Sequence, residues 1–195
     1  MLKVLVLYAN PVRASFGSAL HEQVVSGLMS RGHAVDDCDL YRESFDPILR
    51  EDERIDYHDT NRNRREVFSY TDRVLAAEAL ILIYPVWNEG FPAILKGFFD
   101  RVFIPGVSFK IDAEGRVEPN LSNLKRLSAV CTYGASRPIT FLLGDPPKRV
   151  VKRLIRSMAK RSVPCDYLAC YGMDQATDED RKRFLDKVDR AFGSW

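Results

Sequence analysis

The sequence lacks the patterns that mark metal centres, disulfide frameworks and membrane spans. Its four cysteines form no CxxC pair and its three histidines have no partner at ligand spacing, so we expect no metal site. Cysteines without a pairing pattern are typical of free core thiols in a reducing cytoplasm. No apolar run approaches the roughly 20 residues of a membrane helix, and the short apolar start at 2–8 indicates a strand rather than a signal peptide. A cytoplasmic protein without membrane insertion is predicted.

An excess of charge of one sign is also lacking. Lys and Arg total 29 against 27 for Asp and Glu, a net charge of +2, which is too balanced to argue for nucleic acid from total charge alone, and no nucleic-acid partner is predicted. The one strongly basic segment, residues 148–161, is interpreted as a helix whose cations form the solvated face. Its core-facing stripe is expected to consist of Val150, Val151, Leu154, Ile155 and Met158. With 195 residues and neither repeats nor a linker, the chain is expected to form a single domain, 1–195.

What the sequence does contain is an unbroken apolar run at 79–84, followed by an aromatic loop. Such a run is typical of a central strand that is buried on both faces of a parallel sheet. Pro85 has no N–H group to donate and is expected to end the strand. Pro92 is suited to the first turn of the apolar helix at 93–103 that follows. The loop therefore lies at the carboxyl end of a central strand, where open α/β sheets bind their ligands.

Strands and helices alternate along the whole chain. Strands are predicted at 2–8, 33–40, 79–84, 127–132 and 165–171, and helices at 16–31, 62–78, 93–103, 148–161 and after Thr177. This alternation favours a doubly wound parallel sheet, and five strands rather than six favour the order 2-1-3-4-5. The switch point then lies between the loops at 9–15 and 85–91, flanked by the loop at 132–138. Segment 41–61 is a polar excursion, and 109–117 is predicted to form a hairpin.

The first loop lacks the GxGxxG and GxxxxGK[ST] patterns that cradle the phosphates of nucleotides. It leads instead into a helix that is expected to start with Ser15 as its N-cap, followed by Phe16, Gly17 and Ser18. The free backbone N–H groups of such a helix end bind phosphate without a lysine. A capped helix that binds nothing is the alternative, and Arg13 is either a phosphate partner or a solvated surface side chain.

The second and third loops offer walls for a flat ligand. Trp87 and Phe91 present apolar surface and Asn88 presents hydrogen-bonding groups, unless the two aromatics pack under the neighbouring helix. The third loop adds small or planar groups for the other side of a ring, namely Thr132, Tyr133 and Gly134. A phosphate end and two ring-contacting loops at a topological switch point together predict a flavin pocket.

The strongest motif, at 84–103, reads YPVWNEGFPAILKGFFDRVF. It resembles the signature segment of the flavodoxin-like NAD(P)H:quinone reductase family. The first loop, with the sequence NPVRASFGSAL at 10–20, is similar to the phosphate loop of that family, and the CTYG sequence at 131–134 matches its third loop. The resemblance covers nearly the whole chain and implies a flavodoxin-like fold.

The resemblance also implies a cofactor and a reaction. It implies bound FMN or FAD, with NAD(P)H as the electron donor and a quinone or another small molecule as the acceptor, in a ping-pong cycle. The phosphate or ribityl end would be held by Asn10, Ser15, Phe16 and Gly17. The isoalloxazine would be surrounded by Pro85, Val86, Trp87, Asn88, Thr132, Tyr133 and Gly134. A homodimer with active sites near its interface is implied as well, and the basic helix at 148–161 is a secondary candidate for attracting the NADPH phosphate.

The chain departs from the family at several positions. Ile139 and Leu143 stand near the tyrosine and histidine that relay charge in the mammalian members, Asn10 stands where many members have histidine, and Glu89 stands where an aromatic is common. We assign no catalytic side chain, because hydride transfer is the chemistry of the flavin itself. The alternative function is a regulatory subunit of a membrane transporter that senses flavin or nucleotide, as found in the same family. A flavodoxin-type one-electron carrier is disfavoured by the net charge of +2, because such carriers dock through acidic surfaces.

Overall fold

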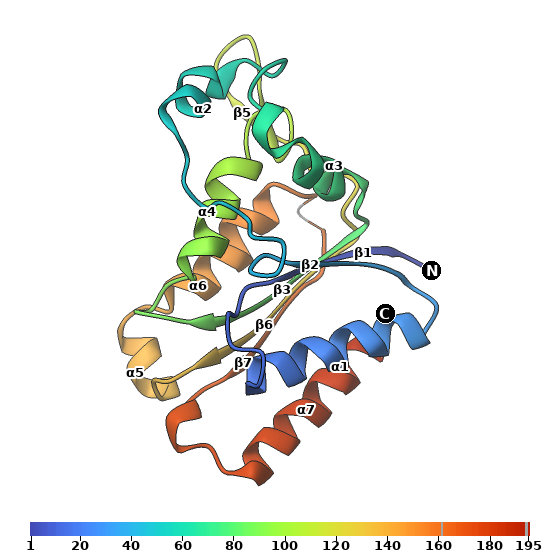
Figure 1. Ribbon diagram of the computed structural model, residues 1–195, viewed down its shortest axis with the longest axis vertical. Helices are drawn as coiled ribbons and strands as arrows, with labels where there is room; N and C mark the ends of the chain where they lie inside the picture. Colours follow the sequence, from blue (N-terminus) through green and yellow to red (C-terminus); the bar gives the residue numbers. More distant parts are fainter. Residues whose placement is uncertain (161, 194) are drawn as a thin grey trace.

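A computed structural model describes residues 1–160, 162–193 and 195 and contains a central parallel sheet in the order β2-β1-β3-β6-β7 (Figure 1). The strands are β1 (Lys3–Tyr8), β2 (Ala34–Asp39), β3 (Ala79–Val86), β6 (Arg126–Tyr133) and β7 (Cys165–Cys170). Every neighbouring pair in this sheet is parallel. The predicted order 2-1-3-4-5 is confirmed, with β6 and β7 as the fourth and fifth strands.

Helices cover both faces of the sheet. One face is covered by α1 (Phe16–Ser30) and α7 (Asp178–Phe192), and the other by α3 (Phe68–Ala76), α4 (Ala93–Val102) and α6 (Pro146–Arg149) with its π-helical continuation at Val150–Ile155 (Figure 1). Side chains of a strand alternate between faces, so Val4 and Val6 pack against α1 while Leu5 and Leu7 belong to the other core. The apolar runs predicted to be central strands are therefore buried on both sides.

Local signals set both ends of α1 and the start of α7 as predicted, whereas the helix predicted at 62–78 is shorter, with α3 at Phe68–Ala76 after a 3-10 turn at Arg65–Val67. The Ser15 side chain accepts a hydrogen bond from the Ser18 N–H at the start of α1, and Gly32, with φ of 83°, follows the end of that helix. Thr177 caps α7, where it forms a reciprocal capping box with Asp180. The hairpin is also present, as β4 (Phe109–Ile111) and β5 (Val117–Pro119). The polar excursion contains a short helix α2 (Glu51–Ile55), and α5 (Arg137–Leu142) follows β6.

Two expectations are wrong. Pro85 does not end the strand, because β3 continues to Val86 opposite Tyr133 of β6. The pairing of β3 with β1 stops at Ile83, so Pro85 lies where the strand has a partner on one side only, a position at which a missing N–H is tolerated. In the basic segment, Val151 and Ile155 are buried but Leu154 is 53% exposed, because the π-helical turn displaces it from the core-facing stripe.

The basic helix was predicted to extend to Arg161, which lies outside the described residues. Among the helices that are described, none is both long enough and apolar enough to cross a membrane.

Candidate cofactor-binding site

The three loops predicted to bind a ligand leave the same edge of the sheet. Strand β1 ends with Tyr8 opposite Ile83, and the Ala9 N–H donates to the Ile83 carbonyl at 3.0 Å. At the end of β3, Pro85 is opposite Thr132 of β6. The chain leaves β1 toward α1 on one face and β3 toward α4 on the other (Figure 1). In open α/β sheets, ligands bind in the crevice outside strand ends that diverge in this way. The structure therefore brings the three predicted loops together.

In the first loop, the polar side chains form hydrogen bonds with one another and with the loop backbone. The Ser15 hydroxyl donates to the Val12 carbonyl at 2.9 Å and accepts from the Asn10 Nδ2 at 3.2 Å and from the Ser18 N–H at 3.1 Å. The Asn10 Oδ1 accepts from the Val12 N–H at 3.0 Å. Because the Ser15 hydroxyl is fully engaged, its role in this structure is to shape the loop and cap α1.

The start of α1 leaves backbone donors for a ligand. The first N–H groups of a helix have no hydrogen-bond partner within the helix. The Ser18 N–H donates to the Ser15 hydroxyl, so the N–H groups of Phe16 and Gly17 remain for a ligand. A Cβ atom on Gly17 would lie only 2.7 Å from the Asn10 Nδ2, so glycine permits the close approach of Asn10 to this helix end. Backbone donors and the positive end of the helix dipole fit a phosphate.

Tyr8 provides a further test of that fit. Its side chain is 4% exposed and stacks on His21 with the ring centroids 4.1 Å apart, and its buried hydroxyl has no hydrogen-bond partner among the described residues. Burial raises the pKa of Tyr8, and the nearby Ser15 and Ser18 side chains oppose that rise. Buried hydroxyls are normally paired, so a group without a partner beneath the start of α1 is consistent with a polar ligand at this place.

The second loop is a tight turn with strained backbone. Trp87 and Gly90 exchange backbone hydrogen bonds at 3.2 and 2.9 Å, and the two residues between them, Asn88 and Glu89, have φ of 49° and 55°. Two successive positive φ values define a type I′ turn, and such strain outside glycine is concentrated at functional sites. The turn presents Trp87, 42% exposed, and the exposed Asn88 at the crevice.

Phe91 packs under the neighbouring helix, which was the alternative to a role in the ligand wall. Its ring contacts Tyr84 and Phe99, with centroid distances of 5.1 and 5.3 Å, so it packs against α4 rather than beside Trp87. Val86 is also buried beneath the turn. Of the residues predicted to surround the ring from this loop, Val86 can offer only its backbone, whereas Pro85, Trp87 and Asn88 also offer side-chain surface.

The third loop likewise offers mainly backbone groups to a ligand. Tyr133 is 1% exposed, and its hydroxyl donates to the Asp145 Oδ1 at 2.7 Å. Its side chain therefore points into the core, away from the crevice. Thr132 is half-buried and Gly134 is exposed, and a Cβ atom on Gly134 would lie 2.9 Å from the Asp174 carboxylate. This loop can approach a ring through Thr132, Gly134 and the backbone of Tyr133.

Behind the third loop lies a buried tyrosine cluster, which was not predicted. The Tyr167 hydroxyl lies 2.5 Å from that of Tyr133 and 3.3 Å from that of Tyr84, while Tyr171 donates to Asp145 at 3.3 Å. Burial raises the pKa of Tyr133, Tyr167 and Tyr84, and it raises that of Tyr171 to about 12. The hydroxyls therefore stay protonated and hold the loop in place. The detectable signal was a tyrosine close to the end of three strands, with Tyr84 near the end of β3, Tyr133 at the end of β6 and Tyr171 just after β7.

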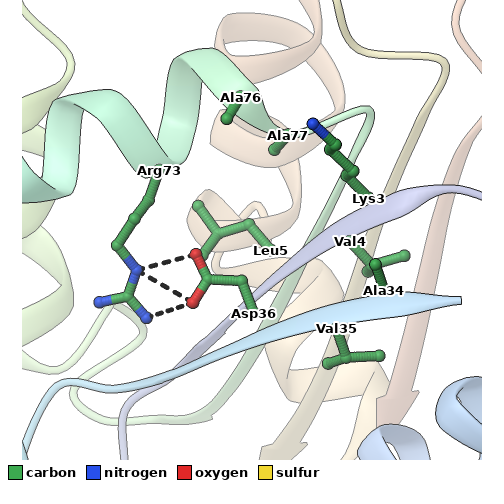
Figure 2. A pocket seen from close by; sticks show the side chains of 9 residues that line it. All are labelled: Lys3, Val4, Leu5, Ala34, Val35, Asp36, Arg73, Ala76 and Ala77. Atoms are coloured by element: carbon green, nitrogen blue, oxygen red, sulfur yellow. Dashed lines mark hydrogen bonds and ion pairs between the residues drawn. The ribbon is translucent and has the colours of Figure 1, made fainter.

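A different cavity lies at the opposite edge of the sheet, where the strands begin. A cavity of about 240 Å³ lies between α3 and the amino-terminal parts of β1 and β2, and it is lined mainly by apolar side chains (Figure 2). At its side Arg73 forms hydrogen bonds of 2.7 to 3.1 Å with Asp36, which Figure 2 shows as dashed lines. These charges are already paired, and no chemistry is assigned to this cavity.

Comparison with known proteins gives matches over most of the chain. The family described as Flavodoxin-like fold matches residues 2–156. An uncharacterized NAD(P)H oxidoreductase of Haemophilus influenzae is 33% identical over 138 residues, which cover 68% of this chain and 64% of that protein. An FMN-dependent NADH:quinone oxidoreductase of Lachnoclostridium phytofermentans is 32% identical over 119 residues, 60% of this chain and 58% of that protein. The chain thus spans less than two thirds of the length of these relatives.

A solved structure is similar over nearly the full length. The NAD(P)H:quinone oxidoreductase from Methanothermobacter marburgensis superposes with a TM-score of 0.82 at 26% sequence identity, covering 98% of this chain and 97% of that one. Its similarity extends beyond residue 156, over the part of the chain that the family match leaves out.

Proposed function

The chain belongs to the Flavodoxin-like fold family and to its NAD(P)H:quinone reductases, and from this premise we propose that it is a flavin-dependent NAD(P)H oxidoreductase. Hydride would pass from NAD(P)H through bound flavin to a quinone or another small acceptor. The observation that carries the proposal is that the loops after β1, β3 and β6 leave the same edge of the sheet, where the backbone N–H groups of Phe16 and Gly17 have no partner within α1. Relatives named as NAD(P)H and FMN-dependent NADH:quinone oxidoreductases support it.

Each loop has a part in the proposed site. The N–H groups of Phe16 and Gly17 would hold the phosphate, while Asn10 and Ser15 keep the loop in the required shape. The turn that carries Trp87 and Asn88 would cover one side of the ring. Residues 132–134 would contact the ring from β6, chiefly through backbone. When bound, a flavin supplies hydride transfer at its N5 atom, so these residues need only bind, orient and exclude water.

A ping-pong cycle is the order of events that we propose. Donor and acceptor must both reach the one flavin ring, so in the proposed cycle they would occupy its exposed face in turn rather than together. Alternate use of one site predicts parallel lines in double-reciprocal plots of rate against NADPH at several acceptor concentrations. Intersecting lines would contradict this order without affecting flavin binding.

An absorption spectrum tests the function directly. The purified protein is expected to be yellow, or to become so with added flavin, and to bleach when NADPH is added without oxygen. Bleaching followed by return of colour on addition of a quinone would establish both half-reactions. A colourless protein that takes up neither FMN nor FAD would contradict the proposal.

We also propose that the active form is a homodimer. An apolar groove of about 570 Å³ runs between α4 and the helix at 150–155, and it begins at Phe91, which follows the second loop. Beyond it, α5 carries Phe141 and Leu142 at 83% and 85% exposure. Apolar surface of this extent is typical of an interface. Sedimentation is expected to give twice the chain mass, and to give a monomer for the double variant Phe141→Ser with Leu142→Ser.

A further inference from the structure

Asp145 lies behind the third loop, in a strained turn between α5 and α6. Gly144 and Asp145 have φ of 88° and 46°, and Pro146 follows at the start of α6. The Asp145 N–H donates to the Thr140 carbonyl at 3.0 Å, and the Arg149 N–H donates to the Asp145 carbonyl at 3.1 Å, so hydrogen bonds on both sides hold the turn. A left-handed backbone is uncommon outside glycine, and strain of this kind is concentrated at functional sites.

The Asp145 carboxylate sets the direction of a chain of hydroxyl hydrogen bonds. Its side chain is 15% exposed, and Tyr133 and Tyr171 donate to its two oxygens at 2.7 and 3.3 Å. A carboxylate only accepts hydrogen bonds, and each tyrosine has one hydroxyl hydrogen to donate. Because Tyr133 gives its hydrogen to Asp145, the Tyr167 hydroxyl must donate to Tyr133, which lies 2.5 Å away. The Tyr84 hydroxyl must then donate to Tyr167 at 3.3 Å.

This hydroxyl chain connects the two loops that would enclose the ring. Tyr84 is the residue before Pro85, where the second loop begins, and its ring centroid lies 5.1 Å from that of Phe91, where the second loop ends. Tyr133 is the last residue of β6 and belongs to the third loop. Both tyrosines are buried in the same core. The hydroxyl chain therefore holds one loop in a defined position relative to the other.

A cation lies beside the carboxylate. The Lys148 Nζ is 3.8 Å from the Asp145 Oδ2 and 5.9 Å from the centre of the Tyr167 ring. A largely buried carboxylate is costly unless it is hydrogen-bonded and paired with an opposite charge, and both conditions are met here. The position of Asp145 is thus fixed by side chains from β6, from α6 and from the segment after β7.

We propose that Asp145 is a positioning residue of the flavin site, and that it sets the separation of the second and third loops through Tyr133, Tyr167 and Tyr84. The inference rests on the proposed function. Loops that are fixed beforehand lose less conformational entropy when they take up a ligand, so the hydroxyl chain would increase flavin affinity. An amide at position 145 would offer one acceptor oxygen and one donor NH2 group, so it could not accept a tyrosine hydrogen on each side.

The first test is Asp145→Asn, which keeps the shape of the side chain and removes one acceptor. We expect the affinity of the apoprotein for FMN and for FAD, measured by calorimetry, to fall about tenfold, because a hydrogen bond to a charged group is lost. The visible circular dichroism of the bound flavin should change as well, because the two loops would meet the ring in altered positions. Glu78→Gln is the matched control. It makes the same carboxylate-to-amide change at the amino edge, where Glu78 accepts from the Lys3 N–H and pairs with Lys125.

The second test shows whether Asp145 acts through the hydroxyl chain. Among the described residues no hydrogen bond joins Asp145 to Tyr84, so independent roles would give additive losses of flavin affinity. Transmission through Tyr167 instead predicts that Asp145→Asn combined with Tyr84→Phe loses no more affinity than the worse single variant. In a Tyr167→Phe background the two changes should become additive to within about twofold. Tyr70→Phe is the control, because Tyr70 packs against the same core from α3, outside the hydroxyl chain.

The outcomes are distinct. Coupled losses of flavin affinity, with both controls unchanged, support the positioning role. A lower urea midpoint with unchanged flavin affinity and circular dichroism would show that Asp145 serves stability alone, and would overturn the proposal. Additive losses would overturn it as well, because the chain through Tyr167 would then transmit nothing. The proposed function stands in both cases, whereas an unmodified protein that takes up no flavin removes the function and this inference together.

A variant at position 145 that does not fold leaves the proposal open to the same test. Tyr84→Phe and Tyr167→Phe keep the carboxylate and break the hydroxyl chain, so each should lower flavin affinity, and the pair should lose no more than the worse single variant. Unchanged flavin affinity in both folded variants would overturn the proposal.

Discussion

The two edges of the central sheet differ in backbone strain and in how their charged groups are paired. At the carboxyl edge, the Tyr8 hydroxyl and the Glu89 Oε2 are buried without partners among the described residues. The four non-glycine residues with positive φ in the described chain also follow strand ends on this side, namely Ser44, Asn88, Glu89 and Asp145. The carboxyl edge therefore contains unsatisfied groups and strained backbone.

The amino edge has ion pairs and shared amide hydrogen bonds, beside the buried hydroxyls of Ser108 and Ser128, which have no partner among the described residues. The Glu78 carboxylate accepts from the Lys3 N–H and pairs with Lys125, which ties the starts of β1 and β6 together. The Asn123 Nδ2 shares its hydrogens among the carbonyls of Val74, Leu75 and Ala77, the last of which it reaches at 2.5 Å. The difference teaches that strained backbone is confined to the ligand side in the described chain, whereas charged pairs at the amino edge connect the starts of the strands.

The largest effect is expected from a charge placed at the ligand edge. Ser15→Glu puts a carboxylate where the phosphate would bind, and a single like-charge contact costs ~1 to 4 kcal/mol at effective dielectrics of 80 to 20. We expect flavin affinity, followed by fluorescence quenching, to fall accordingly. Ser15→Ala is the control, because it removes the cap without adding charge. Unchanged affinity in the glutamate variant would mean that the phosphate lies elsewhere.

A change at the amino edge should lower the stability of the folded protein rather than its flavin affinity. Asn123→Ala leaves three carbonyl groups near the end of α3 without this donor, and unsatisfied polar groups cost ~1 to 3 kcal/mol. We expect the urea midpoint to fall while the flavin affinity of the folded protein stays the same. A loss of flavin affinity equal to that of Ser15→Glu would show that the two edges are not independent.

Tyr8→Phe tests the unsatisfied group itself. The hydroxyl has no partner among the described residues, so its removal should change the unfolding free energy of the apoprotein by less than ~0.5 kcal/mol. If it meets a ligand, flavin affinity should fall by ~0.5 to 1.5 kcal/mol, the net value of one hydrogen bond. Tyr133→Phe provides the contrast, because its hydroxyl is bonded to Asp145 and its loss should reduce apoprotein stability. Equal stability losses in the two variants would contradict the distinction between satisfied and unsatisfied hydroxyls.

The smallest effect is a pH dependence of the amino edge. Hydrogen bonds from Lys125 and from the Lys3 N–H lower the pKa of Glu78 below its ordinary value. A lowered pKa in the folded state means that the stabilisation is present above the unfolded pKa of about 4.5 and is lost as the pH falls through the folded value. Glu78→Gln should therefore make the urea midpoint less sensitive to acidification from about pH 7 to about pH 3.5. An identical pH profile in both proteins would contradict this contribution.

Much of the architecture could be predicted because local patterns were strong. The doubly apolar runs of β1 and β3, the cap at Ser15 and the helix after Thr177 are all present as expected. The convergence of the three loops followed from the strand order alone. The inward direction of Tyr133 and the packing of Phe91 against α4 could not be predicted, because they depend on which neighbour each ring meets.

The sequence by itself determined the strands, the caps and the order of the sheet, since apolar periodicity and capping act over a few residues. Tertiary structure alone decided which polar groups found partners. It joined Tyr133 to Asp145, left the Tyr8 hydroxyl without a hydrogen-bond partner among the described residues and opened a cavity beside His21. The reason is that hydrogen-bond satisfaction and cavity shape depend on side chains from separate elements meeting in space, which no local pattern encodes.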